Sequence, residues 1–273
     1  MIGEGLEAMK WISTGEKGKT LAQGFSERQR SSCLRPAFAI ISFMSHHPSP
    51  FTDHALDWAR IDDVLIDMDG TLLDRHFDNF FFEEELPRRY AAMHGCAFEA
   101  SREQLMAMYR SVEGELAWTD LEYWSGRVGV DVVAMHQELQ YLIGFLPGAE
   151  YFLEAVRAKG KRITVLTNAH HTGVTVKSAK TGLDRYVDRI VDAFEVGYLK
   201  MRPEYWPACR KLVGFDPSRS LYVDDDEACL AAARQYGIAA IVHSAKSSSQ
   251  LPPVRSVNFA SVDHLPALLN GKL

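Results

Sequence analysis

The sequence predicts an α/β protein with a Rossmann-like, doubly wound parallel sheet and one inserted block of helices. Two observations lead to this fold class. Along the second half of the 273-residue chain, short apolar runs rich in β-branched residues alternate with stretches of helical periodicity, the pattern of parallel strands joined by helices. A long helical stretch also follows the first apolar run, before this alternation begins. That stretch is expected to form a separate cap on the sheet core.

The core is assigned to residues 60–76 and 146–273, and the helical cap to residues 77–145. Glycines that follow the helical stretches are expected to end them, because glycine readily adopts the left-handed conformation of a helix C-terminus. The expected strands are 64–66, 163–166, 190–194, 221–223 and 239–243, and the expected helices are 86–93, 103–112, 132–143, 151–159, 172–181, 203–213 and 227–236.

Residues 1–50 differ from the rest of the chain, since they are rich in Gly, Ser, Lys and Arg. They are expected to be a disordered or extended segment, or an artefact of start-codon choice with the natural start at Met44, so that residues 1–43 would not belong to the protein. The alternative is a targeting peptide. Four glutamates in this stretch, and no small-residue cleavage site after the apolar run 37–43, argue against it.

Composition narrows the classes of function. The net charge of −6 argues against a general nucleic-acid binder. No apolar run approaches the roughly 20 residues needed to span a bilayer. The four cysteines are far apart and form no CxxC pair, so neither a disulfide scaffold nor a zinc site is expected. We therefore expect a cytoplasmic protein with a small-molecule partner, no nucleic-acid or membrane partner, and an oligomeric state that the sequence leaves open.

A pair of carboxylates follows the first expected strand, in the run DMDGT at residues 67–71. Sites in open α/β sheets form beyond the carboxyl ends of the strands. Two carboxylates so close repel unless a cation or proton intervenes, and Mg²⁺ prefers oxygen ligands. Asp67 is therefore the candidate nucleophile toward a phosphoryl group, Asp69 the candidate acid and base, and Thr71 a candidate substrate ligand. The alternative is an acidic turn that only caps a helix.

Two further candidates lie after later strands. Thr167 and Asn168 close the strand 163–166, where the hydroxyl can hold a phosphate oxygen and Asn168 can contact the substrate; the alternative is a helix N-cap. Lys200 can offset negative charge on the nucleophile and on the transferred phosphoryl group. A solvated surface lysine is the alternative there, and Arg202 is the local competitor for the role.

Three consecutive acids, residues 224–226, follow the apolar strand 221–223. Charges at a buried strand end are costly unless they are compensated, which favours a cation site over an acidic helix start. The expected magnesium ligands are Asp67, Asp69, Asp224 and Asp225.

The run DMDGTLLD at residues 67–74 resembles the first motif of the haloacid dehalogenase (HAD) superfamily. In order along the chain, Thr167, Lys200 and the pair Asp224–Asp225 resemble the second, third and fourth motifs. The resemblance covers roughly residues 60 to 245. It implies a Rossmann-like core with a cap inserted after the first motif, an aspartyl-phosphate intermediate, and dependence on Mg²⁺.

The chain departs from the family pattern at two positions. Leu199 stands where proline is usual before the lysine, and Asp226 stands where a small residue is usual after the fourth-motif acids. In that register Asp225 is the principal metal ligand and Asp224 the second. Asp69 argues against a dehalogenase, because dehalogenases lack this second acid. The resemblance does not exclude phosphomutases.

Four shorter stretches resemble the bacterial GMP/IMP nucleotidase branch of the superfamily, which implies removal of the 5′-phosphate from purine mononucleotides. The alternatives are a phosphatase or phosphomutase acting on a sugar phosphate or phosphoglycolate, and a non-catalytic HAD-like binding protein. The four stretches are FDNFF at 77–81, LEYWS at 121–125, LTNAH at 166–170 and TGLD at 181–184.

Side chains in the cap are expected to choose the substrate. Trp118, Tyr123 and Trp124 could supply a stacking face for a purine, although packing in the helical core is the more common fate of such aromatics. His170 and His171 could approach the phosphate, or could be exposed loop residues.

Overall fold

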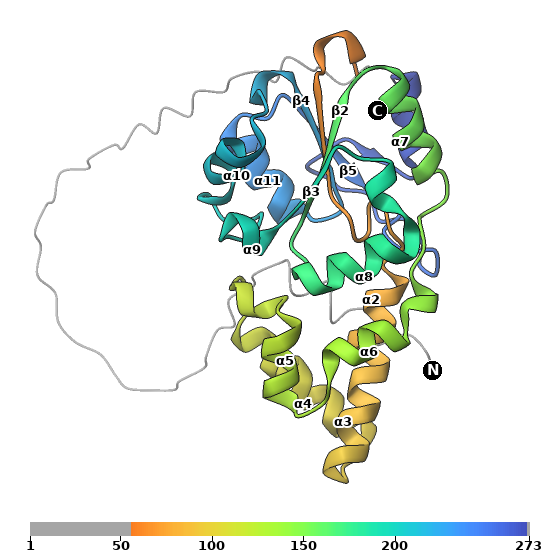
Figure 1. The fold of residues 1–273 in the computed structure, drawn as a ribbon, viewed down its shortest axis with the longest axis vertical. Coiled ribbons are helices and arrows are strands. Elements are labelled where there is room, and N and C mark those ends of the chain that lie inside the picture. Colours follow the sequence, from red (N-terminus) through yellow and green to blue (C-terminus); the bar gives the residue numbers. More distant parts are fainter. Residues whose placement is uncertain (1–55, 272–273) are drawn as a thin grey trace, which may run out of the picture. The chain divides into compact units, whose positions relative to one another are not determined.

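In the computed structural model of the protein, the described residues are 56–271, so the predictions for residues 1–50 lie outside them. Six strands form one parallel sheet in the order β3-β2-β1-β4-β5-β6, visible in the upper part of Figure 1. This is the strand order of doubly wound nucleotide-binding sheets, and it confirms the predicted fold class. The strands are β1 (Asp63–Ile66), β2 (Arg162–Thr167), β3 (Arg189–Asp192), β4 (Ser220–Asp224), β5 (Ala240–Ser244) and β6 (Ser261–Val262).

Strand β1 lies at the centre of the sheet, between β2 and β4. Its last residue, Ile66, pairs with Val165 on one side and with Val223 on the other. All four residues of β1 are buried, as expected for a parallel sheet covered on both faces. Because the three strands run in the same direction and in register, the segments that follow them emerge side by side.

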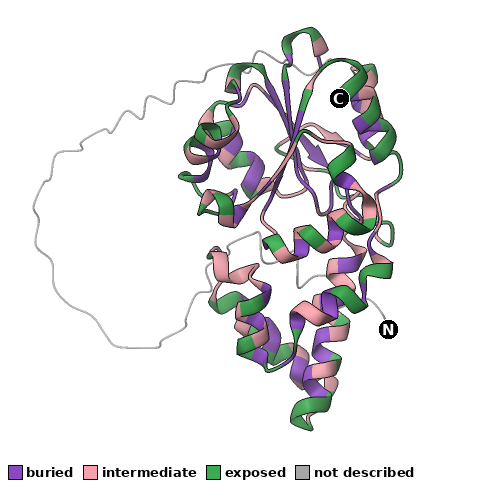
Figure 2. Ribbon diagram, in the orientation of Figure 1, coloured by how far each residue is buried: buried purple, intermediate pink, exposed green. Residues whose placement is uncertain are grey.

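Helices cover both faces of the sheet. Figure 1 shows α10 and α11 on one face and α7 on the other. The central strands β1 and β4 are fully buried, the edge strand β3 is mostly half-buried, and the outer helix faces are exposed (Figure 2). The helices of the core are α7 (Ala149–Ala158), α8 (His171–Thr181), α9 (Ala193–Val196), α10 (Tyr205–Val213) and α11 (Glu227–Tyr236), with short 3-10 turns η1 (Trp58–Arg60), η5 (Leu183–Arg185), η6 (Pro217–Arg219) and η7 (Leu265–Asn270).

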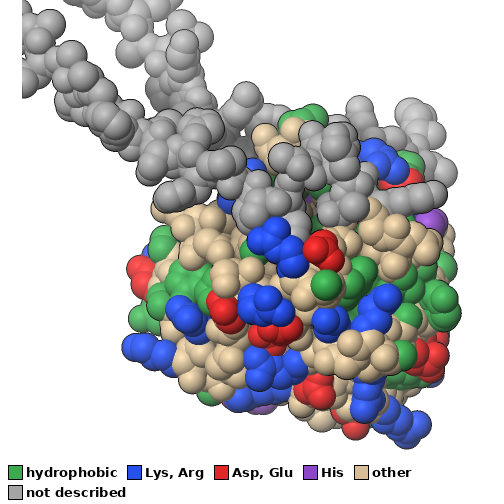
Figure 3. Space-filling model, turned by 90° about the horizontal axis from the view of Figure 1, so that it is seen from above, with side chains coloured by type: hydrophobic (Ala, Val, Ile, Leu, Met, Phe, Trp, Pro, Cys, Tyr) green, Lys and Arg blue, Asp and Glu red, His purple; other side chains and the backbone are tan. Residues whose placement is uncertain are grey.

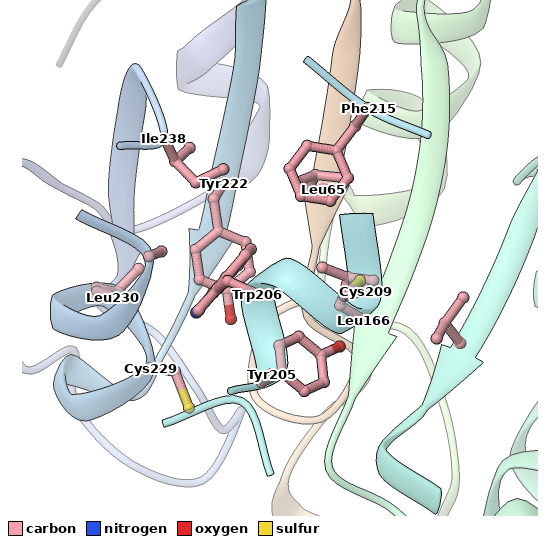
Figure 4. Packing of buried hydrophobic residues seen from close by; sticks show 12 residues of the cluster. Leu65, Leu166, Tyr205, Trp206, Cys209, Phe215, Tyr222, Cys229, Leu230 and Ile238 are labelled. Carbon is pink, nitrogen blue, oxygen red and sulfur yellow. The ribbon is translucent and has the colours of Figure 1, made fainter. Parts of the chain in front are cut away.

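The face under α10 and α11 contains a dense apolar cluster (Figure 4). Trp206 of α10 is fully buried and its ring meets Tyr222 of β4 edge-on, with ring centroids 4.9 Å apart. Leu65 of β1 and Leu230 of α11 pack in the same cluster. Full burial of each such side chain contributes about 1.5–3 kcal/mol, so this cluster fixes β1 and β4, the strands from which the acidic residues emerge.

A helical segment is inserted between β1 and β2. Helices α2 and α3 are continuous through a π-helical turn, and Pro87 lies in the first turn of α3. Proline lacks an amide hydrogen and its ring would clash with the carbonyl four residues earlier, so the wider turn accommodates it. The segment comprises α2 (His76–Phe80), η2 (Phe81–Glu85), α3 (Leu86–His94), α4 (Phe98–Ser111), η3 (Leu116–Trp118), α5 (Leu121–Val128), α6 (Val132–Glu138) and η4 (Gln140–Leu142).

The two ends of this helical segment are joined by backbone hydrogen bonds. The amide of Asp74 donates to Gly144 O over 2.9 Å, and the amide of Leu146 donates to Leu72 O over 2.8 Å. Leu73 and Phe145 form an isolated antiparallel bridge between them. The chain therefore leaves and re-enters the core at one place.

Several element boundaries differ from the expected ones. Strand β3 ends at Asp192, because its carboxylate accepts hydrogen bonds from the amides of Phe194 and Glu195 and so starts α9. The expected helix 132–143 divides into α6 and the 3-10 turn η4. Helix α10 begins at Tyr205 rather than at residue 203. Helices α2 and α5 fall in or beside the expected helical block 77–145 but were not among the individual helices expected, and α9 and β6 were not expected at all.

Oppositely charged side chains form ion pairs near the amino ends of the central strands. Arg162 pairs with Asp63, and Arg219 pairs with Asp62. The face seen in Figure 3 shows the same mixture of basic and acidic side chains. Among residues 56–271, no helix has both the length and the apolar content that crossing a bilayer requires.

The buried His136 of α6 predicts a specific pH dependence of stability. Its pKa is lowered from 6.5 to about 3, mainly by burial and secondly by the charge of Lys177. Between pH 6.5 and 3 the unfolded chain therefore binds a proton that the folded chain does not, so His136 lowers stability as the pH falls, by up to about 1.4 kcal/mol per pH unit.

Replacing His136 with Phe keeps the aromatic contacts to Phe77 and Phe81 and removes this titration. We expect urea unfolding of the variant to depend less steeply on pH between 4.5 and 6.5 than that of the wild type. Equal slopes for the two proteins would contradict the assignment.

Candidate active site

The polar residues at the carboxyl ends of β1, β2 and β4 lie together. Asp67 follows β1, and its amide donates to Val223 O of β4 over 2.9 Å. Thr167 ends β2 and Asp224 ends β4. All three side chains are almost completely buried. Side chains distant in the sequence thus line one edge of the sheet, where open α/β sheets place their sites.

The ammonium group of Lys200 lies between two of these carboxylates. It donates to Asp67 Oδ1, to Asp224 Oδ2 over 2.8 Å and to Leu166 O over 3.1 Å. Lys200 is 2% exposed, and Tyr222 Oη donates to the same oxygen of Asp224. Arg202, the competing cation of the sequence analysis, is exposed. Lys200 is thus the cation that contacts the candidate nucleophile.

Burial perturbs the ionisation of this group of residues. It raises the pKa of Asp67 well above its ordinary range; Lys200 opposes this rise, while Asp224 and Asp225 add to it. Burial alone would lower the pKa of Lys200, but Asp224 and Asp67 raise it well above the ordinary value. A buried lysine between two carboxylates therefore stays charged.

Asp225 reaches the same site across Gly70. A Cβ atom at Gly70 would lie 2.3 Å from Asp225 Oδ2, and Gly70 has a φ of +91°. Only glycine allows both this backbone conformation and this close approach. Arg75 then pairs with Asp225, with 2.6 Å between Nη1 and Oδ2.

Asp67, Asp224 and Asp225 offer carboxylate oxygens that all lie within 4.8 Å of one another. Lys200 and Arg75 supply two positive charges beside these three carboxylates. One negative charge is therefore left uncompensated. Asp67 Oδ2 is buried and has no hydrogen-bond partner among residues 56–271. Three hard oxygen donors with surplus negative charge fit a divalent cation such as Mg²⁺.

The carboxylate of Asp69, an expected metal ligand, is not part of this group of three. Its Oδ1 lies 2.7 Å from Nζ of Lys177 in α8. Lys177 also donates to both carboxylate oxygens of Asp78 in α2, over 2.7 and 3.0 Å. Alternation along an extended chain suggested that Asp67 and Asp69 point to one side; the tight turn around Gly70 directs them to different partners instead.

The expected substrate-binding residues have different surroundings. Thr167 Oγ1 accepts a hydrogen bond from the amide of Ala169 over 3.0 Å, which orders the start of the loop before α8. Asn168 Oδ1 accepts from the amide of Lys200 over 2.9 Å and so fixes the lysine loop. Thr71 is buried, and its hydroxyl has no partner within the described part of the chain; it lines a small crevice beside Ser244.

The remaining candidates have structural contacts. Asp226 caps α11 by accepting from the amide of Ala228 over 2.7 Å. His170 caps α8, and its Nε2 lies 3.7 Å from Asp120 Oδ1 at the start of α5. Its ring lies against that of exposed His171, with ring centroids 3.8 Å apart and the two planes tilted by 39°.

The aromatic residues of the helical segment differ in burial. Trp124 is fully buried and its Nε1 donates to Trp118 O over 2.9 Å, so it packs in the helical core. Trp118 and Tyr123 are half-buried.

Arg75 and Lys177 were not predicted as site residues. Asp78 lies in the stretch FDNFF that resembles the nucleotidase branch, where a place near the substrate was expected but no partner was named. Lys177 and Gly173 are the buried residues of α8, and a lysine is almost never fully buried unless it is paired. The partners of Lys177 lie about 100 residues away in the sequence, so spacing alone could not find them.

The chain matches the description of haloacid dehalogenase-like hydrolases over residues 61–237. It is 39% identical over 181 residues to the GMP/IMP nucleotidase YrfG of Escherichia coli strain K12, covering 66% of this chain and 82% of that relative. It is 32% identical over 92 residues to a phosphoglycolate phosphatase of Cupriavidus necator, covering 34% and 40% of the two chains. The chain belongs to the haloacid dehalogenase-like hydrolases, which confirms the predicted family and its class as a hydrolase.

Solved structures agree on the fold. A HAD phosphatase from Thermococcus onnurineus superposes with a TM-score of 0.65 at 19% identity, covering 78% of this chain and 99% of that one. A HAD-superfamily hydrolase from Geobacter sulfurreducens superposes with a TM-score of 0.52 at 21% identity, covering 77% and 96%.

The close approach at Gly70 predicts that Gly70→Ala damages both folding and the acidic group. The variant would hold alanine at a positive φ, at a cost of about 1–3 kcal/mol, and would displace Asp225. We expect a lower urea midpoint and a smaller rise in melting temperature on adding Mg²⁺. Gly144→Ala is the matched control, because its added Cβ would meet nothing within 4 Å. Equal behaviour of the two variants would refute the argument.

Proposed function

We propose that the protein is a magnesium-dependent phosphomonoester hydrolase that forms an aspartyl-phosphate on Asp67. One observation carries the proposal. Asp67 lies at the carboxyl end of the central strand, with Lys200 on one carboxylate oxygen and no partner on the other among residues 56–271. Burial raises the pKa of Asp67, and Lys200 together with a bound Mg²⁺ would oppose that rise and favour the ionised form. An ionised carboxylate held in this way is suited to nucleophilic attack.

In the first step a carboxylate oxygen of Asp67 attacks the phosphorus atom, and the bond between phosphorus and the ester oxygen breaks. The leaving oxygen takes the electron pair of that bond and a proton from Asp69. Burial and the neighbouring Asp78 raise the pKa of Asp69 against the opposing effect of Lys177, which favours the protonated form that this step needs. Lys200 stabilises negative charge on the transferred group and on Asp67. The alcohol then leaves, and the phosphoryl group remains on Asp67.

In the second step a water molecule attacks the phosphorus of the aspartyl-phosphate. Asp69, now a carboxylate, takes a proton from this water, and the bond to Asp67 breaks with its electron pair returning to the carboxylate. Inorganic phosphate leaves, with Asp67 ionised and Asp69 protonated as at the start.

Asp67, Asp224 and Asp225 would hold Mg²⁺, which supplies positive charge that attracts the phosphate dianion and offsets carboxylate repulsion. Asp69 is better suited to proton transfer than to metal binding, because its carboxylate lies on Lys177. Thr167 and Thr71 are the proposed phosphate and substrate contacts, and Asn168 acts by fixing the loop of Lys200.

The proposed substrate is a purine 5′-mononucleotide, GMP or IMP. The 39% identity to a GMP/IMP nucleotidase over 82% of that relative supports this choice. We further propose that residues 77–145 act as a cap that selects the alcohol part of the ester. Trp118 and Tyr123 are the aromatic candidates for stacking on a base, since Trp124 is fully buried.

A sugar-phosphate or phosphoglycolate phosphatase is the second candidate, supported by the partial match to a phosphoglycolate phosphatase. Steady-state rates for GMP, IMP, AMP, phosphoglycolate and glucose phosphates would separate the two. A kcat/KM for GMP or IMP below that for phosphoglycolate would overturn the nucleotide assignment.

Asp67→Asn should abolish hydrolysis, because an amide is not a nucleophile. With p-nitrophenyl phosphate and Mg²⁺ we expect kcat to fall by at least about 10⁴-fold. Acid-quenched wild-type protein should carry ³²P from a labelled ester, and the variant should carry none. Asp216→Asn, at an exposed cap before the amino end of β4, is the matched control and should keep its activity. Retained turnover in Asp67→Asn would refute Asp67 as the nucleophile.

Asp225→Asn should weaken Mg²⁺ binding by at least about tenfold, because cation affinity follows the number of charged ligands. Calorimetric titration with Mg²⁺ measures this without substrate. Asp226→Asn is the control: Asp226 caps α11, and asparagine caps helices equally well, so we expect its Mg²⁺ affinity to change less than about twofold. Equal losses in both variants would contradict the proposed ligand set.

A further inference from the structure

A buried ion-pair bridge joins the proposed acid to the helical segment. Its three members are Asp69 after β1, Lys177 in α8 and Asp78 in α2. Lys177 Nζ lies 2.7 Å from Asp69 Oδ1 and donates to both oxygens of Asp78. We call this set the Asp69–Lys177–Asp78 bridge.

The bridge is closed to solvent at its centre. Lys177 is 2% exposed, and its side chain packs over the ring of Phe77, with Nζ 5.3 Å from the ring centroid. Phe77 is buried as well. A buried ammonium group cannot turn toward water, so its geometry is fixed by its two carboxylate partners. Lys177 in turn holds the carboxylates of Asp69 and Asp78 in place.

The two carboxylates are the more accessible members of the bridge. The side chains of Asp69 and Asp78 are 20% and 17% exposed, against 3% for that of Lys177. The turn around Gly70 holds Asp225 and directs Asp67 to Lys200, but the carboxylate of Asp69 is held by Lys177. The direction of that carboxylate is therefore set from α8.

Proton transfer requires this direction to be accurate. A general acid works only when its proton is within hydrogen-bond reach of the leaving oxygen, and a displacement of about 1 Å can cost about 100-fold in rate. A carboxylate attached to the chain through rotatable bonds needs a second anchor to meet that requirement.

We propose that Lys177 is a positioning residue for the acid–base step. Asp78 holds the ammonium group of Lys177 in place, so that α2 helps to set the direction of the Asp69 carboxyl group. The proposal rests on the proposed function, in which Asp69 protonates the leaving oxygen. Lys177 itself touches no reacting atom. The competing explanation is that the bridge only attaches α2 to the core.

Two esters of similar size distinguish these explanations. p-Nitrophenolate leaves readily without a proton, whereas phenolate is a much poorer leaving group and depends on the acid. Release of each phenol is measured in a single turnover with Mg²⁺, which isolates the step that phosphorylates Asp67. In Lys177→Met we expect the rate for phenyl phosphate to fall about 100-fold and that for p-nitrophenyl phosphate to change less than about threefold.

Lys180→Met is the matched control, since Lys180 lies on the same helix and is exposed; it should leave both rates unchanged. Equal losses for both esters in Lys177→Met would overturn the proposal, because misplaced helices would slow both reactions alike. An unchanged rate for phenyl phosphate would overturn it as well. Failure of the proposed function looks different: wild-type protein would then hydrolyse neither ester.

A double variant covers the case in which Lys177→Met does not fold. Lys177→Met with Asp78→Leu replaces a buried ion pair by apolar side chains, a change that proteins often tolerate. In the proposal Asp78 orients Asp69 by way of Lys177, so the double variant should show the same selective loss for phenyl phosphate as the single variant, within about threefold. Loss of both activities in the double variant, with its fold intact by circular dichroism, would refute the proposal.

Discussion

The structure of the site depends on one constraint: negative charge is buried where the central strands end. Asp67 and Asp224 are almost fully enclosed, and the ammonium group of Lys200 lies between them. Without that group two carboxylates would face each other at low dielectric, at a cost of several kcal/mol. Much of the surrounding polar structure serves this contact, since Asn168 fixes the amide of Lys200 and Tyr222 donates to Asp224.

The sequence could predict the site wherever a strand determines the position of a residue. Parallel strands end at one edge, so an acid after the first strand and two acids after the fourth had to meet there. The role of Lys200 was harder to predict, because Lys200 lies in a loop, where the direction of a side chain depends on tertiary contacts. Its prediction depended on its order among the motifs, and its burial beside Asp67 depends on contacts that only the folded chain reveals.

The sequence could not predict contacts made across helices. Lys177 meets Asp69 and Asp78 only after α8 packs beside α2, and helical periodicity does not say which neighbour a buried face will contact. The same limit explains Asp69, whose partner is a lysine outside the acidic group of three. Trp124 is a further example. It is fully buried because of how the helices pack, and its local sequence does not specify that packing.

The pairing of the two ends of the helical segment makes it a module. The amide of Asp74 donates to Gly144 O, and the amide of Leu146 donates to Leu72 O. The chain therefore leaves the core and returns to it at one short pair of hydrogen-bonded segments. No strand of the sheet passes through this segment. Insertions, deletions or wholesale exchange between these ends would therefore leave the sheet order and the acidic residues in place. A single catalytic core of this design can acquire new selectivity by replacing one continuous stretch of gene.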